Sequence, residues 1–113
     1  MTLEDMFRCQ GDFNKLFFNS DNLSDLEKEE ITKSLTLALH TEVSELISAI
    51  NFKDHRQSRS QIDREKIIYE SIDVFRYLLA ILNLWDIRSD QFVSAFDDKD
   101  LFLHSRHQME SVK

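Results

Sequence analysis

The amino-acid sequence predicts a fold built from α-helices alone, and two observations lead to this prediction. The 113 residues include one glycine and no proline, whereas the turns that join β-strands depend on these residues for their backbone angles. Apolar residues also recur every three or four positions over long stretches, which is the period of an amphipathic helix. The length fits one domain, covering residues 1–113, and so short a chain buries only about two thirds of its unfolded surface.

Four helices are expected in order along the chain. The first covers residues 2–19, and polar, turn-prone residues follow it. The second covers residues 24–51 and begins at Ser24, because Ser24 with Glu27 three residues later forms a capping box. A basic loop, residues 52–61, then leads to the third helix.

The third helix, residues 62–85, is apolar on nearly every side in its second half. A helix that is apolar all round is buried all round, and so small a protein has little to bury it with. We therefore expect a four-helix bundle whose core is completed by another subunit. The fourth helix covers residues 89–108, with Ser89 as its N-cap.

Charge and composition exclude several classes of function. The net charge of −7 argues against binding to nucleic-acid polymers, since such binding rests on Lys and Arg neutralising phosphates. A free nucleotide stays possible, because a metal ion can carry the compensating charge. Cys9 is the single cysteine, the N-terminus lacks a signal-peptide pattern, and no apolar stretch is long enough to span a membrane. A cytoplasmic protein without a membrane partner is expected.

Acidic residues three positions apart occur four times, which is about what chance gives for a chain this acidic. Two pairs differ from the others by lying on apolar helix faces. Glu42 and Glu45 fall within an apolar stripe of the second helix, and Glu70 and Asp73 precede the apolar half of the third. That stripe consists of Ile31, Leu35, Ala38, Leu39, Leu46 and Ala49.

Four carboxylates that face a core repel one another and lose hydration, so both effects oppose their ionisation. A divalent cation removes this conflict. Oxygen ligands of this kind suit Mg²⁺, with Mn²⁺ as a substitute. The sequence therefore predicts a metal site at Glu42, Glu45, Glu70 and Asp73. The alternative is that these acids point to solvent and pair with Lys or Arg.

The sequence around the two acidic pairs resembles the signature of a known family. Residues 42–50 read EVSELISAI, and residues 70–79 read ESIDVFRYLL. This is similar to the ExxE…ExxD signature of the all-α nucleoside triphosphate pyrophosphohydrolases, which comprise MazG-like enzymes and dimeric dUTPases. The resemblance implies a MazG-type fold and hydrolysis between the α- and β-phosphates, giving a nucleoside monophosphate and pyrophosphate. It also implies that the four acids bind Mg²⁺ and that Glu42 or Glu45 orients or deprotonates the attacking water.

The resemblance further implies contacts to the substrate. Family members often carry Lys, then Asn four residues later, then Arg three after that; here Lys99 and Arg106 match, but Leu103 replaces the Asn. Both basic residues could instead extend along the core with their charges in solvent. Gln10 and Asn14 lie where the family recognises the base, or they form the polar edge of an amphipathic helix.

Two further residues have open roles. Lys53 either meets a phosphate or is a solvated loop residue, and Asn83 either contacts the nucleotide or is a buried core amide. The sequence does not select the base. A homodimer or homotetramer is expected from the apolar third helix. The rival hypothesis is a non-catalytic acidic helical module for oligomerisation or partner binding.

Overall fold

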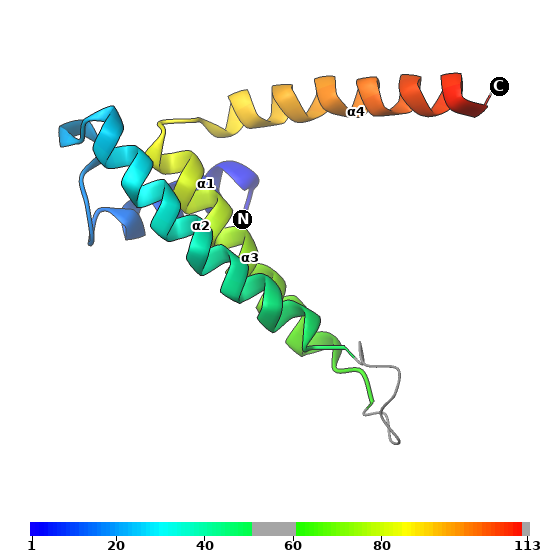
Figure 1. Cartoon of the computed structure of the whole chain (residues 1–113), viewed down its shortest axis with the longest axis horizontal. Helices are drawn as coiled ribbons and strands as arrows, with labels where there is room; N and C mark the ends of the chain where they lie inside the picture. Colours follow the sequence, from blue (N-terminus) through cyan, green and yellow to red (C-terminus); the bar gives the residue numbers. More distant parts are fainter. Residues whose placement is uncertain (51–60, 112–113) are drawn as a thin grey trace.

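The computed structural model describes residues 1–50 and 61–111, and all regular structure in these ranges is helical (Figure 1). The all-α prediction is therefore confirmed. The elements are α1 (Leu3–Asn14), the 3₁₀ helix η1 (Ser20–Asn22), α2 (Asp25–Ile47), α3 (Arg64–Leu84) and α4 (Ser89–Ser111). Lys53 and most of the predicted basic loop lie outside the described residues.

Side-chain caps define where the helices begin. The predicted capping box of α2 is confirmed, with the Glu27 N–H donating to Ser24 Oγ at 3.1 Å and the Ser24 N–H to Glu27 Oε1 at 3.0 Å. The prediction for α4 is wrong by one residue. Ser89 is already helical, and the Arg88 N–H donates to Gln91 Oε1 at 2.9 Å.

The first helix ends five residues earlier than predicted. α1 stops at Asn14, after which the Asn14 carbonyl accepts from the N–H groups of Phe17 and Phe18 in a tight turn. Asn19 then caps η1 by accepting from the Asp21 N–H at 3.1 Å. Side-chain bonds of this kind compete with the helix, and this explains why apolar spacing alone overestimated its length.

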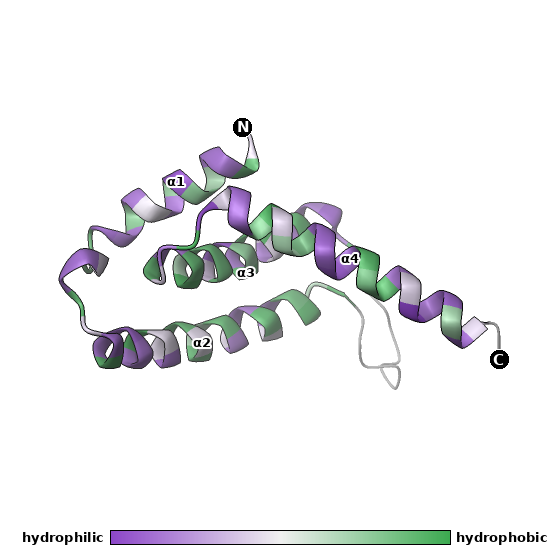
Figure 2. Cartoon of the chain, turned by 90° about the horizontal axis from the view of Figure 1, so that it is seen from above, coloured by the Kyte–Doolittle hydropathy of each residue, from purple (hydrophilic) through white to green (hydrophobic). Residues whose placement is uncertain are grey.

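Three helices pack together, with α3 lying between α1 and α2 (Figure 2). Phe7 of α1 and Leu79, Ala80 and Leu84 of α3 form the buried core. The second helix ends at Ile47, four residues earlier than predicted, so Ala49 is buried in the turn after α2. The other members of the predicted apolar stripe lie within α2 and are half-buried. The core is thus placed at the junction of three helices rather than four.

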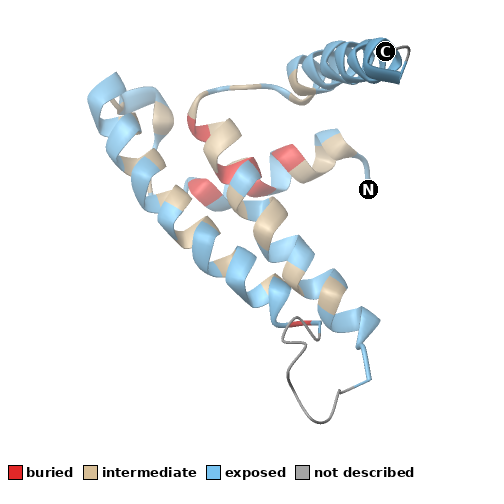
Figure 3. Cartoon of the chain, turned by 45° about the vertical axis from the view of Figure 1, so that its right-hand side comes forward, coloured by how far each residue is buried: buried red, intermediate tan, exposed pale blue. Residues whose placement is uncertain are grey.

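Helix α4 leaves this core, and most of its residues are exposed (Figure 3). Its start contacts α1, where the Phe92 and Phe7 rings lie 5.9 Å apart between centroids. The four predicted helices are therefore confirmed, and within a single chain the fourth contacts the others mainly at its start. The radius of gyration is 18.0 Å, against about 13 Å for a compact domain of this length. Completion of the core by another subunit stays a prediction.

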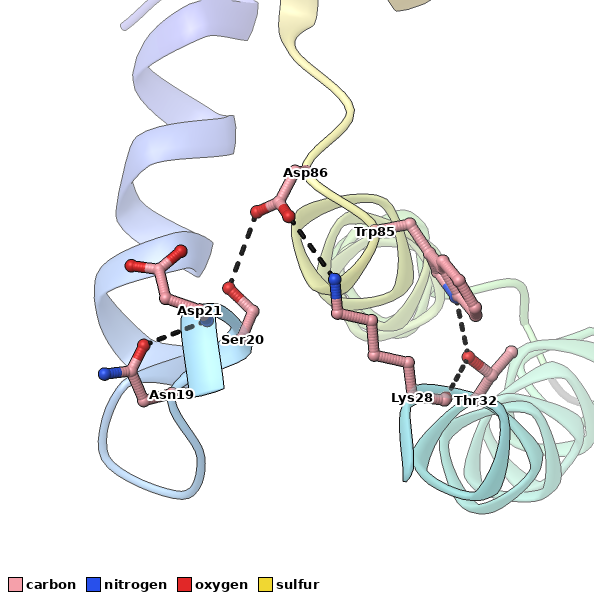
Figure 4. Close-up of polar contacts among 7 residues, drawn as sticks. All are labelled: Asn19, Ser20, Asp21, Lys28, Thr32, Trp85 and Asp86. Carbon is pink, nitrogen blue, oxygen red and sulfur yellow. Dashed lines mark hydrogen bonds and ion pairs between the residues drawn. The ribbon is translucent and has the colours of Figure 1, made fainter. Parts of the chain in front are cut away.

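The departure of α4 begins at a polar junction after α3 (Figure 4). Asp86 has a positive φ of 55°, which turns the chain away from the α3 axis. Its carboxylate accepts from Ser20 Oγ and from Lys28 Nζ, each at 3.5 Å. The neighbouring Trp85 Nε1–H donates to Thr32 Oγ1 at 2.8 Å. These contacts fasten the end of α3 to η1 and α2.

Among the helices described, none is both long and apolar enough to cross a membrane.

Candidate metal centre and adjoining pocket

Three carboxylates from two helices converge where α2 and α3 lie side by side. Glu42 comes from α2, and Glu70 and Asp73 come from successive turns of α3. One oxygen atom from each lies within 4.8 Å of the other two. Glu42 and Glu70 are half-buried and Asp73 is exposed. This group, which we call the acidic cluster, joins three of the four predicted metal ligands.

The acidic cluster is electrostatically unfavourable without a cation. Burial raises the pKa of Glu42 above its ordinary value of 4.5, and the negative charges of Asp73, Glu70 and Glu45 raise it further. A divalent cation among the three carboxylates would reverse this effect, since opposite charge favours the ionised form. Hard oxygen donors are the ligands that Mg²⁺ and Mn²⁺ prefer, and these ions share their coordination shell with water and phosphates.

Glu45 is the predicted ligand that the structure leaves out of the cluster. It is exposed, whereas Glu42, one turn earlier on α2, is half-buried. Glu42 therefore faces α3, while Glu45 lies at the edge of that face. Its charge still raises the pKa of Glu42, so it borders the cluster.

A pocket of about 430 Å³ adjoins the acidic cluster, since Glu42 and Asp73 line it as well. Its walls come from the end of α1 and the turn after it, from α2 and from α3. Most of this lining is apolar or aromatic, which is typical of small-molecule sites. The aromatic members are Phe13, Phe17, Phe18 and Tyr77.

Two buried amides in this pocket form a chain of hydrogen bonds with a defined direction. Asn14 Nδ2 donates to the Ala80 carbonyl at 3.1 Å, and Gln10 Nε2 donates to Asn14 Oδ1 at 3.1 Å. A carbonyl only accepts, so it fixes the orientation of Asn14, and Asn14 in turn fixes that of Gln10. Gln10 is 5% exposed, and its Oε1 has no partner among the described residues. Gln10 lines the pocket, and its unpaired acceptor atom is itself buried.

The predicted Gln10 and Asn14 thus lie in the pocket beside the acidic cluster, whereas Asn83, Lys99 and Arg106 do not line it, and Lys53 lies outside the described residues. Asn83 Nδ2 donates to the carbonyls of Phe7 at 3.0 Å and Leu79 at 2.9 Å, so this amide links α1 to α3. Lys99 and Arg106 are exposed on α4, where Arg106 pairs with Glu110 at 3.4 Å. No α4 residue lines this pocket.

Sequence reasoning missed Arg76 and Tyr77, which both line the pocket. A usable signal was present. Positions 73, 76, 77 and 80 follow the spacing of residues on one helix face, and Arg76 is a charge inside an apolar run. The pocket's phenylalanines gave no such signal, because apolar residues of α1 are equally expected in a core.

Comparisons with curated proteins and with solved structures found no match. A comparison with protein families found that the model described as dUTPase matches residues 2–112, which is nearly the whole chain. The chain therefore belongs to the dUTPase family, and this membership indicates a hydrolase that acts on nucleotides.

Proposed function

We propose that the protein is a Mg²⁺-dependent nucleoside triphosphate pyrophosphohydrolase. It would cleave between the α- and β-phosphates and release a nucleoside monophosphate and pyrophosphate. The observation that carries this proposal is the convergence of Glu42, Glu70 and Asp73 beside a pocket lined by Gln10, whose buried Oε1 has no partner among the described residues. Membership of the dUTPase family supports the same reaction.

We propose dUTP as the first substrate to test. Uracil presents an N–H group, which can donate to Gln10 Oε1 and satisfy that buried acceptor once a small shift of the side chain opens it to the pocket. The aromatic lining can stack against the flat base. dCTP, whose amino group also donates, and non-standard deoxynucleotides are the alternatives for the panel.

The chain's own residues would divide the work as follows. Glu42, Glu70 and Asp73 hold the cation, and the pocket fixes the nucleoside. A bound Mg²⁺ supplies charge neutralisation and an activated water. Glu45 borders the cluster and is exposed, so it can orient the attacking water and take its proton. The water adds to phosphorus while the bridging P–O bond breaks, and pyrophosphate and the monophosphate separate.

Positive charge for the triphosphate would come from a second copy of the chain in a homodimer or homotetramer. Lys99 and Arg106 are exposed on α4, which leaves its own core. An α4 helix that packs on another subunit could bring both residues to that subunit's phosphates. The uncovered apolar side of α3, which includes Ile68, Ile72 and Leu78, is the surface we propose for this contact.

The second candidate function is a non-catalytic module for oligomerisation or partner binding. The exposed apolar residues of α3 and α4 favour it. That hypothesis gives no role to the unpaired Gln10 oxygen or to three carboxylates within 4.8 Å. It predicts neither turnover nor stabilisation by metal and nucleotide.

Pyrophosphate release from a panel of NTPs and dNTPs, with Mg²⁺ and with Mn²⁺, tests the proposal. We expect turnover by the wild type, none by Asp73→Asn, and unchanged turnover by Glu30→Gln, an exposed acid on α2 that pairs with Lys33. Mg²⁺ with dUTP should raise the melting midpoint of the wild type. An absence of both turnover and stabilisation would leave the interaction module as the function.

A further inference from the structure

We infer that Arg76 is a specificity-determining residue that reads the base. Its guanidinium would donate to an acceptor atom of the base, next to the N–H group that Gln10 Oε1 accepts. Together the two residues would recognise a base edge on which a donor and an acceptor are neighbours. The inference deepens the proposed function and rests on it for the identity of the ligand.

The position of Arg76 is set from two helices. It lies one turn of α3 after Asp73 and one turn before Ala80, and it lines the pocket with both. Its guanidinium carbon lies 5.6 Å from the centroid of the Phe13 ring, a distance at which a cation is attracted to the ring face. Phe13 follows Gln10 by three residues, so both project from one side of α1. The contact therefore holds the guanidinium on the side of the pocket that carries Gln10.

Of the pocket side chains Gln10, Asn14 and Arg76, Arg76 is the one whose N–H groups are available to donate to a base. The amide nitrogens of Gln10 and Asn14 already donate within the chain of hydrogen bonds to Ala80. In the described part of the chain, the arginine ion pairs involve Arg8, Arg88 and Arg106, and Arg76 is not among them. A guanidinium has five N–H donors and no acceptor, so Arg76 supplies what the buried amides lack.

The base is a better partner for Arg76 than the phosphates. The acidic cluster would hold the cation that neutralises the phosphates, whereas Arg76 is held over Phe13 among the aromatic residues. Its planar fork suits neighbouring acceptors on a flat ring. A base that reversed the donor and acceptor would leave the buried Gln10 Oε1 unpaired and the exposed Arg76 without its base contact, and an unpaired buried group gives strong discrimination.

Nucleoside binding without metal tests the inference independently of catalysis. The probes are deoxyuridine and deoxycytidine, and affinity is followed by amide chemical shifts in ¹H–¹⁵N spectra. We expect Arg76→Gln to weaken the better-bound nucleoside about tenfold or more, as for loss of a charged hydrogen bond. Arg76→Lys should lose most of the affinity as well, because an ammonium lacks the fork. The control Arg64→Gln removes the same charge from the exposed start of α3 and should change affinity less than twofold.

Turnover of substrates with and without a base distinguishes a contact of Arg76 with the base from a contact with the phosphates. Arg76→Gln should lower kcat/KM for dUTP about tenfold or more, while hydrolysis of deoxyribose 5′-triphosphate, which lacks a base, stays at the wild-type rate. Equal losses on both substrates would place Arg76 at the phosphates and overturn the inference. So would a wild type that binds neither nucleoside, or an Arg76→Gln variant that binds them unchanged. Weaker nucleoside binding by the variant in a protein that hydrolyses nothing would support base reading while refuting the proposed reaction.

Discussion

The pKa of Glu42 is raised both by burial and by repulsion from neighbouring carboxylates. Its carboxylate is half-buried, faces α3 and lies beside Asp73 and Glu70, and all of these conditions raise its pKa. A carboxyl group whose pKa is raised by folding favours the folded state only while it is protonated. Without a cation, the free energy of unfolding should therefore decrease as the pH rises above the ordinary value of 4.5.

Replacing Glu42 by Gln should remove this pH dependence. In EDTA at pH 7 we expect Glu42→Gln to melt at a higher temperature than the wild type, and at pH 4 the difference should vanish. Addition of Mg²⁺ should raise the melting midpoint of the wild type and leave that of the variant nearly unchanged. Thermal melts between pH 4 and pH 7 provide the measurement. If Glu30→Gln, on the exposed side of α2, gave the same gain at pH 7, general charge repulsion rather than the cluster would be responsible.

Asn14 lines the pocket and also connects α1 to α3 through its hydrogen bond to the Ala80 carbonyl. Asn14→Ala should reduce the free energy of unfolding by about 1–3 kcal/mol, because it removes the hydrogen bond to the Ala80 carbonyl and leaves the buried Gln10 amide nitrogen without its partner. Urea unfolding measures the change. Asn22→Ala, which alters an exposed asparagine, is the matched control. Equal stabilities of the two variants would mean that the buried chain of hydrogen bonds adds nothing to folding.

The candidate site could be predicted from sequence where a side chain's helical face decided its position. Glu42, Glu70 and Asp73 were found because they interrupt apolar faces. Glu45 was placed with them because it falls in the same apolar stripe as Glu42, but it is exposed and lies outside the cluster. The direction of the amide chain from Ala80 to Gln10 could not be predicted, since it depends on a contact between residues 66 positions apart.

At the scale of helices, the seam between α1 and α3 depends on the single glycine. A Cβ atom at Gly11 would lie 2.8 Å from Asn83 Oδ1, and Asn83 is held in place by its bonds to the Phe7 and Leu79 carbonyls. The close approach of the two helices at this point explains why glycine occupies a helix interior, where it costs about 1 kcal/mol relative to alanine.

Whether Gly11→Ala raises or lowers the free energy of unfolding should depend on the side chain at Asn83. In the wild type we expect a loss of about 1 kcal/mol or more in the free energy of unfolding, since the clash exceeds the gain in helix propensity. In an Asn83→Ala background the same substitution should be stabilising. A double-mutant cycle by urea unfolding gives both values. Destabilisation of similar size in the two backgrounds would contradict the assigned contact.

Helix boundaries were predictable where a cap acts locally. The Ser24 and Glu27 box was recognised, whereas the equivalent box of Thr2 and Asp5 at the start of α1 was overlooked. The end of α1 was not predictable from apolar spacing, because Leu16 and Phe17 continue the pattern yet are 73% and 72% exposed. Those positions are decided by the turn that follows Asn14.

At the scale of the whole molecule, one chain leaves apolar surface that a second copy could cover. Ile72 of α3 is 45% exposed, and Phe96 and Leu101 of α4 are 65% and 70% exposed. The sequence did indicate that α3 is too apolar for a lone chain. It could not show that α4 departs, because an apolar helix face does not reveal which chain it packs against.

Ile72→Glu should disrupt assembly. We expect the wild type to sediment as a dimer or a larger assembly, and we expect Ile72→Glu to sediment predominantly as a monomer, because a charge in an apolar interface loses its hydration. Leu37→Glu introduces the same charge at an exposed leucine of α2 and should leave the assembly unchanged. Analytical ultracentrifugation at several concentrations makes the comparison. A monomeric wild type would refute this arrangement.

The two asparagines that join α1 to α3 also limit how the protein's selectivity can evolve. Asn14 donates to α3 at Ala80, and Asn83 donates to α1 at Phe7, so each helix is tied to the backbone of the other. A mutation at either asparagine would alter the alignment of the helices along with the pocket. Gln10 and Arg76 carry no such tie between the two backbones, so selection could exchange them with less penalty to folding. New substrate preferences should therefore arise at those two positions.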